Sequence, residues 1–207
     1  MHRTTLVIAF SVLFFAVCAA ADEPYRGAQS QPVDVQNIKL ELDVDLRARE
    51  ISGSATIDFA ALSVLKSVSL DAVGHEVSSV EQIHDGSPPQ SMQHHNTGEK
   101  LLIDFPQPLA RGEAARIKIA YRVRDPKTGA YFFGPSETDP EVPWMMWTQG
   151  EPNGNRFWFP AFDHPNEKQT TSIVATVDAE LEVLSNGTLV PREEDHERST
   201  HRLTLKR

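Results

Sequence analysis

The chain has 207 residues, a formal net charge of −9 and a single cysteine. This length is sufficient for one domain with its own hydrophobic core, and the lack of paired cysteines excludes a small disulfide-held scaffold. The acidic charge argues against nucleic acid and anionic membrane surfaces as partners.

Residues 1–21 have the features of a secretion signal. Arg3 supplies the positive start, Leu6 to Ala20 form an apolar run, and Ala19-Ala20-Ala21 is a small-residue cleavage site just before Asp22. The apolar run is short for a membrane span. The sequence therefore predicts a cleaved signal and a secreted or periplasmic protein, with no membrane partner after cleavage.

Two other interpretations of this segment stay open. It could remain as an uncleaved anchor, or Cys18 could carry a lipid, although Val17 stands where lipidation requires a small residue. Cleavage would remove Cys18 and Arg3 together, so the mature chain would have no cysteine and a net charge of −10.

The polar residues 22–32 predict a flexible lead-in, and strand patterns follow. From Ile38 to Leu46, apolar residues alternate with charged ones, which is typical of a strand with one wet face. The same criterion predicts strands near residues 51–59, 68–70, 77–83, 101–105, 117–123, 173–177 and from 201 onward. Gly53 is a candidate β-bulge. Asn186-Gly187 predicts a tight hairpin turn, which we prefer to the glycosylation motif formed with Thr188.

No segment after the signal has a convincing helical period. The sequence therefore predicts one all-β domain over residues 33–207, built as a twisted sandwich of antiparallel sheets.

A loop rich in proline and aromatic residues is the most distinctive part of the chain. All three tryptophans, Trp144, Trp147 and Trp158, fall in it, together with the amide of Gln149 and the carboxylate of Glu151. Residues two apart in an extended segment point to the same side, so these two polar groups could face one pocket. The alternative for Glu151 is a solvated loop glutamate that makes a local turn.

Three landmarks in this region occur in order: Gln149-Gly150-Glu151, the run Phe159-Pro160-Ala161-Phe162-Asp163-His164-Pro165, and Ser185-Asn186-Gly187. In this order they resemble the N-terminal domain of the M1 family of zinc aminopeptidases, to which aminopeptidase N and leukotriene A4 hydrolase belong. The likeness covers roughly residues 33–207. Many members have Cys and Glu where this chain has Ala161 and His164, which leaves the subfamily open.

The resemblance implies a role for both polar residues. Glu151 matches the position that anchors the substrate α-amino group, and Gln149 matches the companion substrate contact. A carboxylate suits that task because charge-assisted hydrogen bonds are about twice as strong as neutral ones. The expected partners are the amino end of a peptide substrate and a C-terminal catalytic domain.

The resemblance also places zinc outside this chain. The family holds its metal with His-Glu-x-x-His and a later Glu, and neither this motif nor the Gly-x-Met-x-Asn segment occurs here. The nearest approach pairs His196 with His201, five residues apart, a spacing that turns the rings away from each other on a helix or a strand. His94 and His95 lie in a polar segment that we expect to be a surface loop.

Asp163 and Arg156 are expected to be structural. A carboxylate before a proline usually accepts backbone N–H groups, and Arg156 could pair with Asp163 or with another acid.

The sequence thus predicts the substrate-recognition domain of an exported M1-type aminopeptidase that removes N-terminal residues from peptides. Whether the chain has enzymatic activity by itself stays open, since the zinc motif is absent. The alternative is a non-catalytic β-sandwich that binds a peptide or protein.

Overall fold

The computed structural model describes residues 31–194 and 198–205, which form thirteen strands and one short 3-10 turn. The predicted signal peptide, most of the predicted lead-in and His196 lie outside the described residues. The strands are β1 (Val33–Asp45), β2 (Glu50–Ala61), β3 (Leu65–Asp71), β4 (Glu76–Gln82), β5 (Gln90–Ser91), β6 (Gln93–Asn96), β7 (Lys100–Leu109), β8 (Ala114–Arg124), β9 (Ala130–Phe133), β10 (Met145–Thr148), β11 (Thr170–Asp178), β12 (Thr188–Glu194) and β13 (Arg198–Leu205). The 3-10 turn spans Asn155–Phe157.

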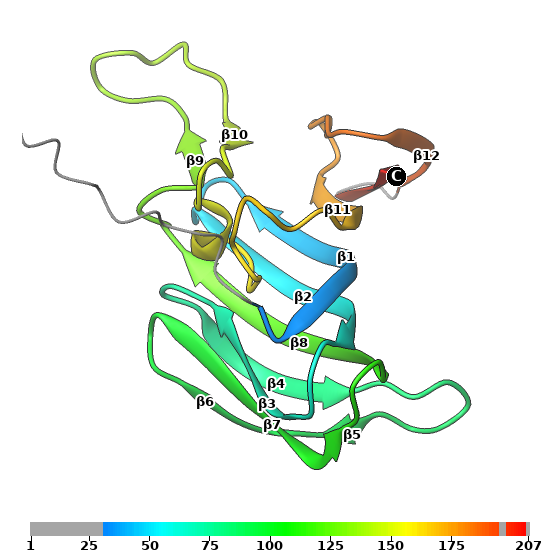
Figure 1. The fold of residues 1–207 in the computed structure, drawn as a ribbon. Coiled ribbons are helices and arrows are strands. Elements are labelled where there is room, and N and C mark those ends of the chain that lie inside the picture. The colour runs from blue at the N-terminus through cyan, green and yellow to red at the C-terminus, as the bar shows by residue number, and fades with distance from the viewer. Residues whose placement is uncertain (1–30, 195–197, 206–207) are drawn as a thin grey trace, which may run out of the picture.

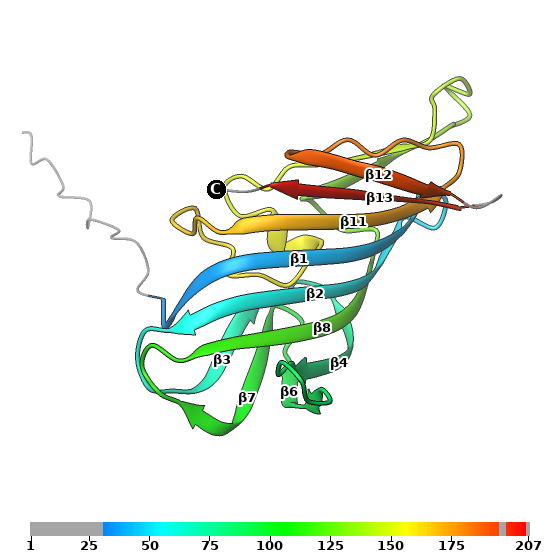
Figure 2. The same cartoon turned by 90° about the vertical axis from the view of Figure 1, so that its right-hand side faces the viewer.

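The strands form three sheets. An eight-stranded sheet has the order β12-β13-β11-β1-β2-β8-β4-β5, a three-stranded sheet has the order β3-β7-β6, and β9 pairs with β10. Figure 2 shows β12, β13, β11, β1, β2 and β8 running one beside the next. In Figure 1 the β9–β10 pair and the three-stranded sheet lie toward opposite ends of the large sheet.

The hydrophobic core fills the space between the large sheet and the three-stranded sheet. Phe59 of β2 meets Phe105 of β7 edge to face, with 6.2 Å between ring centroids. The pairs Ile57 and Phe59 of β2, Ile117 and Ile119 of β8, and Leu101 and Ile103 of β7 are fully buried. Burial at every second position is what a sheet with one covered face requires. The prediction of an all-β fold with packed antiparallel sheets is therefore confirmed.

One strand pair has a direction that the sequence did not predict. β1 and β11 are parallel, from Asn37 opposite Thr170 to Asp43 opposite Thr176, whereas the other described pairs are antiparallel. The side chain of Thr170 donates hydrogen bonds to the carbonyl of Gln36 and the amide oxygen of Asn37, which fixes the start of this register.

Two local predictions were wrong. Gly53 lies in unbroken register with both Leu42 and Tyr121, so it is not a bulge; the register shift of β1 falls between Val35 and Asn37. Gly53 has φ of 140°, and a Cβ there would collide with the carbonyl oxygen of Glu41, so the position requires glycine for close strand approach.

The predicted hairpin at Asn186-Gly187 is also wrong. Residues 181–187 form no strand, β12 begins at Thr188, and its antiparallel partner is the following strand β13. The Asn-Gly pair therefore ends a loop before the hairpin, and the positive φ of Gly187 serves that bend.

His94 and His95 are exposed, as predicted, but they belong to β6 instead of a loop. Within residues 31–194 and 198–205, no helix is long and apolar enough to cross a membrane.

Candidate functional site

The loop that carries Gln149 and Glu151 leaves the end of β10. Its backbone is tied at once to the residue before β9, because the N–H of Gln149 donates to the carbonyl of Gly129 at 2.8 Å. Trp147 of β10 stacks on Tyr131 of β9 with 4.7 Å between ring centroids. The Tyr131 hydroxyl lies 2.8 Å from the Thr128 hydroxyl. The start of the loop is therefore held by both backbone and ring contacts.

The chain then turns sharply between Gly150 and Gly154. The N–H of Gly154 donates to the carbonyl of Gly150 at 2.6 Å, and the Glu151–Pro152 peptide bond is cis. Because β10 ends at Thr148 and Glu151 opens this turn, the two polar residues do not share one extended segment. We expected an extended backbone to point the side chains of Gln149 and Glu151 to the same side. That expectation was wrong, because Glu151 lies in a turn and not in an extended segment.

Gln149 and Glu151 are both exposed. Neither side chain has a hydrogen bond or ion pair within the part of the chain that the structure describes. Their predicted roles in substrate binding stay predictions.

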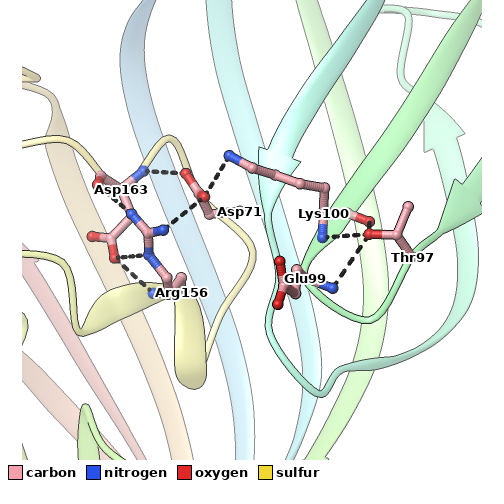
Figure 3. A network of polar contacts seen from close by, with 6 residues as sticks. All are labelled: Asp71, Thr97, Glu99, Lys100, Arg156 and Asp163. Carbon is pink, nitrogen blue, oxygen red and sulfur yellow. Dashed lines mark hydrogen bonds and ion pairs between the residues drawn. The ribbon is translucent and has the colours of Figure 1, made fainter. Parts of the chain in front are cut away.

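A buried ionic network fastens the far end of the loop. Figure 3 shows the guanidinium of Arg156 between the carboxylates of Asp163 and Asp71, at 3.1 Å and 3.0 Å. Arg156 also donates to the carbonyl of Asp163 at 3.0 Å, and its backbone N–H donates to the Asp163 carboxylate. Lys100 of β7 donates to Asp71 at 2.6 Å. The side chain of Asp163 is 3% exposed and that of Asp71 10%, so both carboxylates depend on these cations.

This network joins the loop to the three-stranded sheet. Asp71, the last residue of β3, forms a two-way backbone bridge with Ala161, and the N–H of Val73 donates to the carbonyl of Arg156. Arg156 does pair with Asp163, as predicted, and the Asp163 carboxylate accepts one backbone N–H, that of Arg156. Asp71 and Lys100 were not predicted, because no local pattern reveals a contact that spans about ninety residues.

Aromatic residues of the loop divide into a covered set and an exposed set. Trp158 and Phe159 are buried and meet edge to face at 4.5 Å. Trp147 is 46% exposed and Met145 45%. Arg47 lies over the ring of Trp144 at 5.9 Å, a cation–π contact. Trp158 is therefore covered by the rest of the domain, whereas Trp147 and Met145 of β10 are not.

A second group of buried polar side chains lies beside the loop. His75 and Tyr121 meet edge to face at 5.1 Å. Within the described residues, neither the His75 ring nitrogens, the Tyr121 hydroxyl nor the indole nitrogen of Trp158 has a hydrogen-bond partner. Desolvation lowers the pKa of His75 to about 4. Burial also raises the pKa of Tyr121. Both side chains are therefore neutral at neutral pH.

These residues do not make a metal site. Over the described ranges, no group of three or more His, Cys, Asp or Glu side chains could hold a metal ion. His201 is buried and lies 3.1 Å from the Ser199 hydroxyl, which occupies its Nε2 atom. Among the residues that the structure describes, the available donors thus do not fit a zinc site.

Comparisons with known proteins identify the family to which the chain belongs. The chain is 27% identical to rat aminopeptidase B over 202 residues, which cover 82% of this chain and 31% of that protein. It is 33% identical over 103 residues to the fruit-fly (Drosophila melanogaster) transcription initiation factor TFIID subunit 2, covering 46% of this chain and 8% of that protein. The structure resembles an M1 zinc metallopeptidase variant from Deinococcus radiodurans bound to a Tyr-Ser-Ala substrate. That similarity has a TM-score of 0.69 and 25% identity, and covers 84% of this chain and 39% of the other.

The chain therefore spans well under half the length of these relatives. Residues 34–204 match the model of the peptidase M1 N-terminal domain. The chain belongs to the M1 peptidase family, as its N-terminal domain.

Proposed function

We propose that this chain is the substrate-recognition domain of an exported zinc aminopeptidase and that Glu151 binds the substrate α-ammonium. Gln149 would hydrogen-bond the first peptide unit and orient it. The proposal rests on the exposure of Glu151 and on its lack of a partner within the described structure. Glu151 is an exposed carboxylate without a protein partner among the described residues, on a turn that is fastened at both ends.

A fixed, unpaired carboxylate is suited to an exopeptidase. A free α-ammonium distinguishes the end of a peptide from its interior, and a charge-assisted hydrogen bond reads that difference. Because the Gly129 contact and the Arg156 network hold the turn, little ordering of the loop is needed when substrate arrives. In the whole enzyme, zinc held by another domain would activate the attacking water.

The test is kinetic and uses the polypeptide that joins this domain to its zinc domain. Glu151→Ala should lower kcat/KM for a free-amine aminoacyl-anilide by about ten- to more than a hundredfold, the cost of one charged hydrogen bond. Glu151→Gln keeps the shape and should lose most of the same activity. Gln149→Ala should lose less, because a neutral contact is weaker.

Glu137→Ala is the matched control, since Glu137 is an exposed glutamate on the β9–β10 loop. It should leave the kinetics unchanged. If a folded Glu151→Ala enzyme kept wild-type kcat/KM, Glu151 would not be the amine anchor and the turn would be an ordinary solvated loop.

Export is part of the proposal and rests on residues 1–21. The mature protein should begin near Asp22. Intact-mass measurement of the protein recovered from outside the cytoplasm tests this, and a mass that retains the first 21 residues would mean that the segment is an anchor.

A non-catalytic role is the second candidate. It is supported by the similarity to a TFIID subunit, a protein whose name describes a transcription factor and not a peptidase. An enzyme assay of the longer polypeptide separates the two, because a binding module would show no activity with Glu151 intact.

A further inference from the structure

An apolar groove of about 550 Å³ runs beside β10. Its floor is the inner face of β1 and β11, including Leu42, Val44, Ile173 and Ala175. One wall is β10, and the other is the segment 181–185, which follows β11. The groove is thus an opening into the core of the large sheet.

The β10 wall is a strand edge. All four residues Met145–Thr148 line the groove, although successive side chains of a strand point to opposite faces, so the groove must follow the edge of the strand. In the described structure β10 pairs only with β9. The N–H of Gln149 donates to the carbonyl of Gly129, which continues the register of the β9–β10 pair by one residue. By the alternation of an antiparallel ladder, the N–H groups of Met146 and Thr148 therefore point away from β9, along the open edge.

The opposite wall also lies outside every sheet. Residues 181–185 belong to no strand, yet the half-buried Leu181 and Val183 alternate with the exposed Glu182 and Leu184, which is the period of an extended segment. Leu184 is 91% exposed. Two unpaired extended segments with an apolar floor between them have the form of a slot for one more strand.

We propose that this groove receives an extended apolar strand from the part of the enzyme outside this chain, hydrogen-bonded to the free edge of β10. The inference rests on the proposed function in one respect. β10 leads directly into Gln149, so a domain that completes the substrate site must come close to this edge. The relatives provide that additional polypeptide, since this chain matches only 31% of rat aminopeptidase B.

Charge selects against a second copy of this chain as the occupant. Glu182 lies on the rim of the groove, and the chain carries a net charge of −9, so two copies would bring like charges together. An apolar strand with Lys or Arg at its ends would meet the acidic rim favourably.

The test uses the purified chain and a peptide that cannot bind through an amine anchor. The probe is an eight-residue peptide with alternating Val and Leu in the centre and Lys at both ends, acetylated and amidated. Saturable quenching or enhancement of tryptophan fluorescence should report binding beside Trp147. Hydrogen exchange at the amides of Met146 and Thr148 should slow when the peptide is added.

Variants distinguish strand pairing from nonspecific hydrophobic binding. Thr148→Pro removes an N–H donor on the open edge but no hydrogen bond to β9, and it should weaken peptide binding by about two- to tenfold. Thr148→Val keeps the donor and should not weaken binding. The same peptide N-methylated along one edge should bind more weakly than its parent. Leu184→Asp should abolish binding, and Leu62→Asp, at an exposed leucine outside the groove lining, should leave it unchanged.

Absence of saturable binding up to about 1 mM peptide, or binding indifferent to Thr148→Pro and N-methylation, would overturn the proposal. A concentration-dependent dimer that Leu184→Asp dissociates would assign the groove to a second copy and overturn it as well. The probe has no free amino end, so a lack of peptide binding would not contradict the role proposed for Glu151. Conversely, unchanged kinetics of Glu151→Ala would not contradict strand binding in the groove.

Discussion

Arg156 and Asp163 are seven residues apart, and three hydrogen bonds run from the first residue to the second. The backbone N–H and the Nε atom of Arg156 both donate to the Asp163 carboxylate, and Nη2 donates to its carbonyl. The pair closes the part of the loop that begins where the turn carrying Glu151 ends, so its integrity should govern both stability and the placement of Glu151.

Arg156→Ala should destabilise the domain by about 3–5 kcal/mol. The substitution strands the carboxylates of Asp163 and Asp71 away from solvent with too few cations to pair them. Urea unfolding measures the loss. Arg122→Ala is the matched control, because its ion pair with Glu76 spans 3.6 Å between exposed side chains and should contribute less than about 1 kcal/mol. Equal effects of the two substitutions would contradict a structural role for the Arg156 network.

Gly129→Ala should destabilise the protein more than Gly112→Ala. Both glycines have nearly the same φ, 84° and 83°. Alanine at either position should therefore lose about 1–2 kcal/mol of stability, because its side chain disfavours the left-handed backbone. At Gly112 a Cβ meets open space, whereas at Gly129 it collides with the carbonyl oxygen of Gly154. Overpacking should add about 1–3 kcal/mol at Gly129 alone. Thermal melting of the two variants side by side tests the difference, and matching melting temperatures would mean that the turn shifts freely.

Acid should destabilise the protein through His75. Its pKa is about 4 in the folded protein against 6.5 for an ordinary histidine, so the unfolded chain binds more protons between these values. This contribution to stability is complete above about pH 6.5 and falls by about 3 kcal/mol as the pH approaches 4. The measurement is the free energy of unfolding at several pH values, compared with His75→Phe. The variant should lose less stability than wild type over this range, and identical slopes would exclude His75 as the source.

The isolated chain should bind no stoichiometric zinc and hydrolyse no aminoacyl-anilide. His94 and His95 are neighbours on a strand, so their rings face opposite sides and cannot share an ion. Metal analysis after dialysis, together with the anilide assay, examines both parts. One zinc retained per chain would require a site that joins histidines not brought together here.

The strands most faithfully predicted from sequence are those with one wet face. β1 and β8 alternate charged and apolar residues so regularly that their buried faces follow from the pattern. β9 was not predicted, because the strand has only four residues, Ala130–Phe133, and shows no alternation of polar and apolar side chains. The prediction from Asn186-Gly187 was wrong for a different reason. These two residues indicate that the chain bends, but they do not indicate which segment pairs with β12, and in the structure that segment is β13.

For the site, the sequence indicated the loop, its two polar residues and the pairing of Arg156 with Asp163, but not the contacts that join the loop to the three-stranded sheet. Asp163 and Arg156 were recognisable because they are close in sequence. Asp71 was not, since it lies 92 residues before Asp163 in the chain, and Lys100 lies beside it only through the pairing of β3 with β7. Contacts of this kind depend on tertiary packing and leave no local pattern.

The parallel pairing of β1 with β11 has a consequence for how the molecule folds. Asn37 and Thr170 lie opposite each other although 133 residues separate them in the chain. Closing so long a loop is entropically costly until β2, β8 and the intervening sheets have shortened it. We therefore expect β11 and β13 to join the sheet late during folding and to open first in native-state hydrogen exchange, while β2 and β8 stay protected.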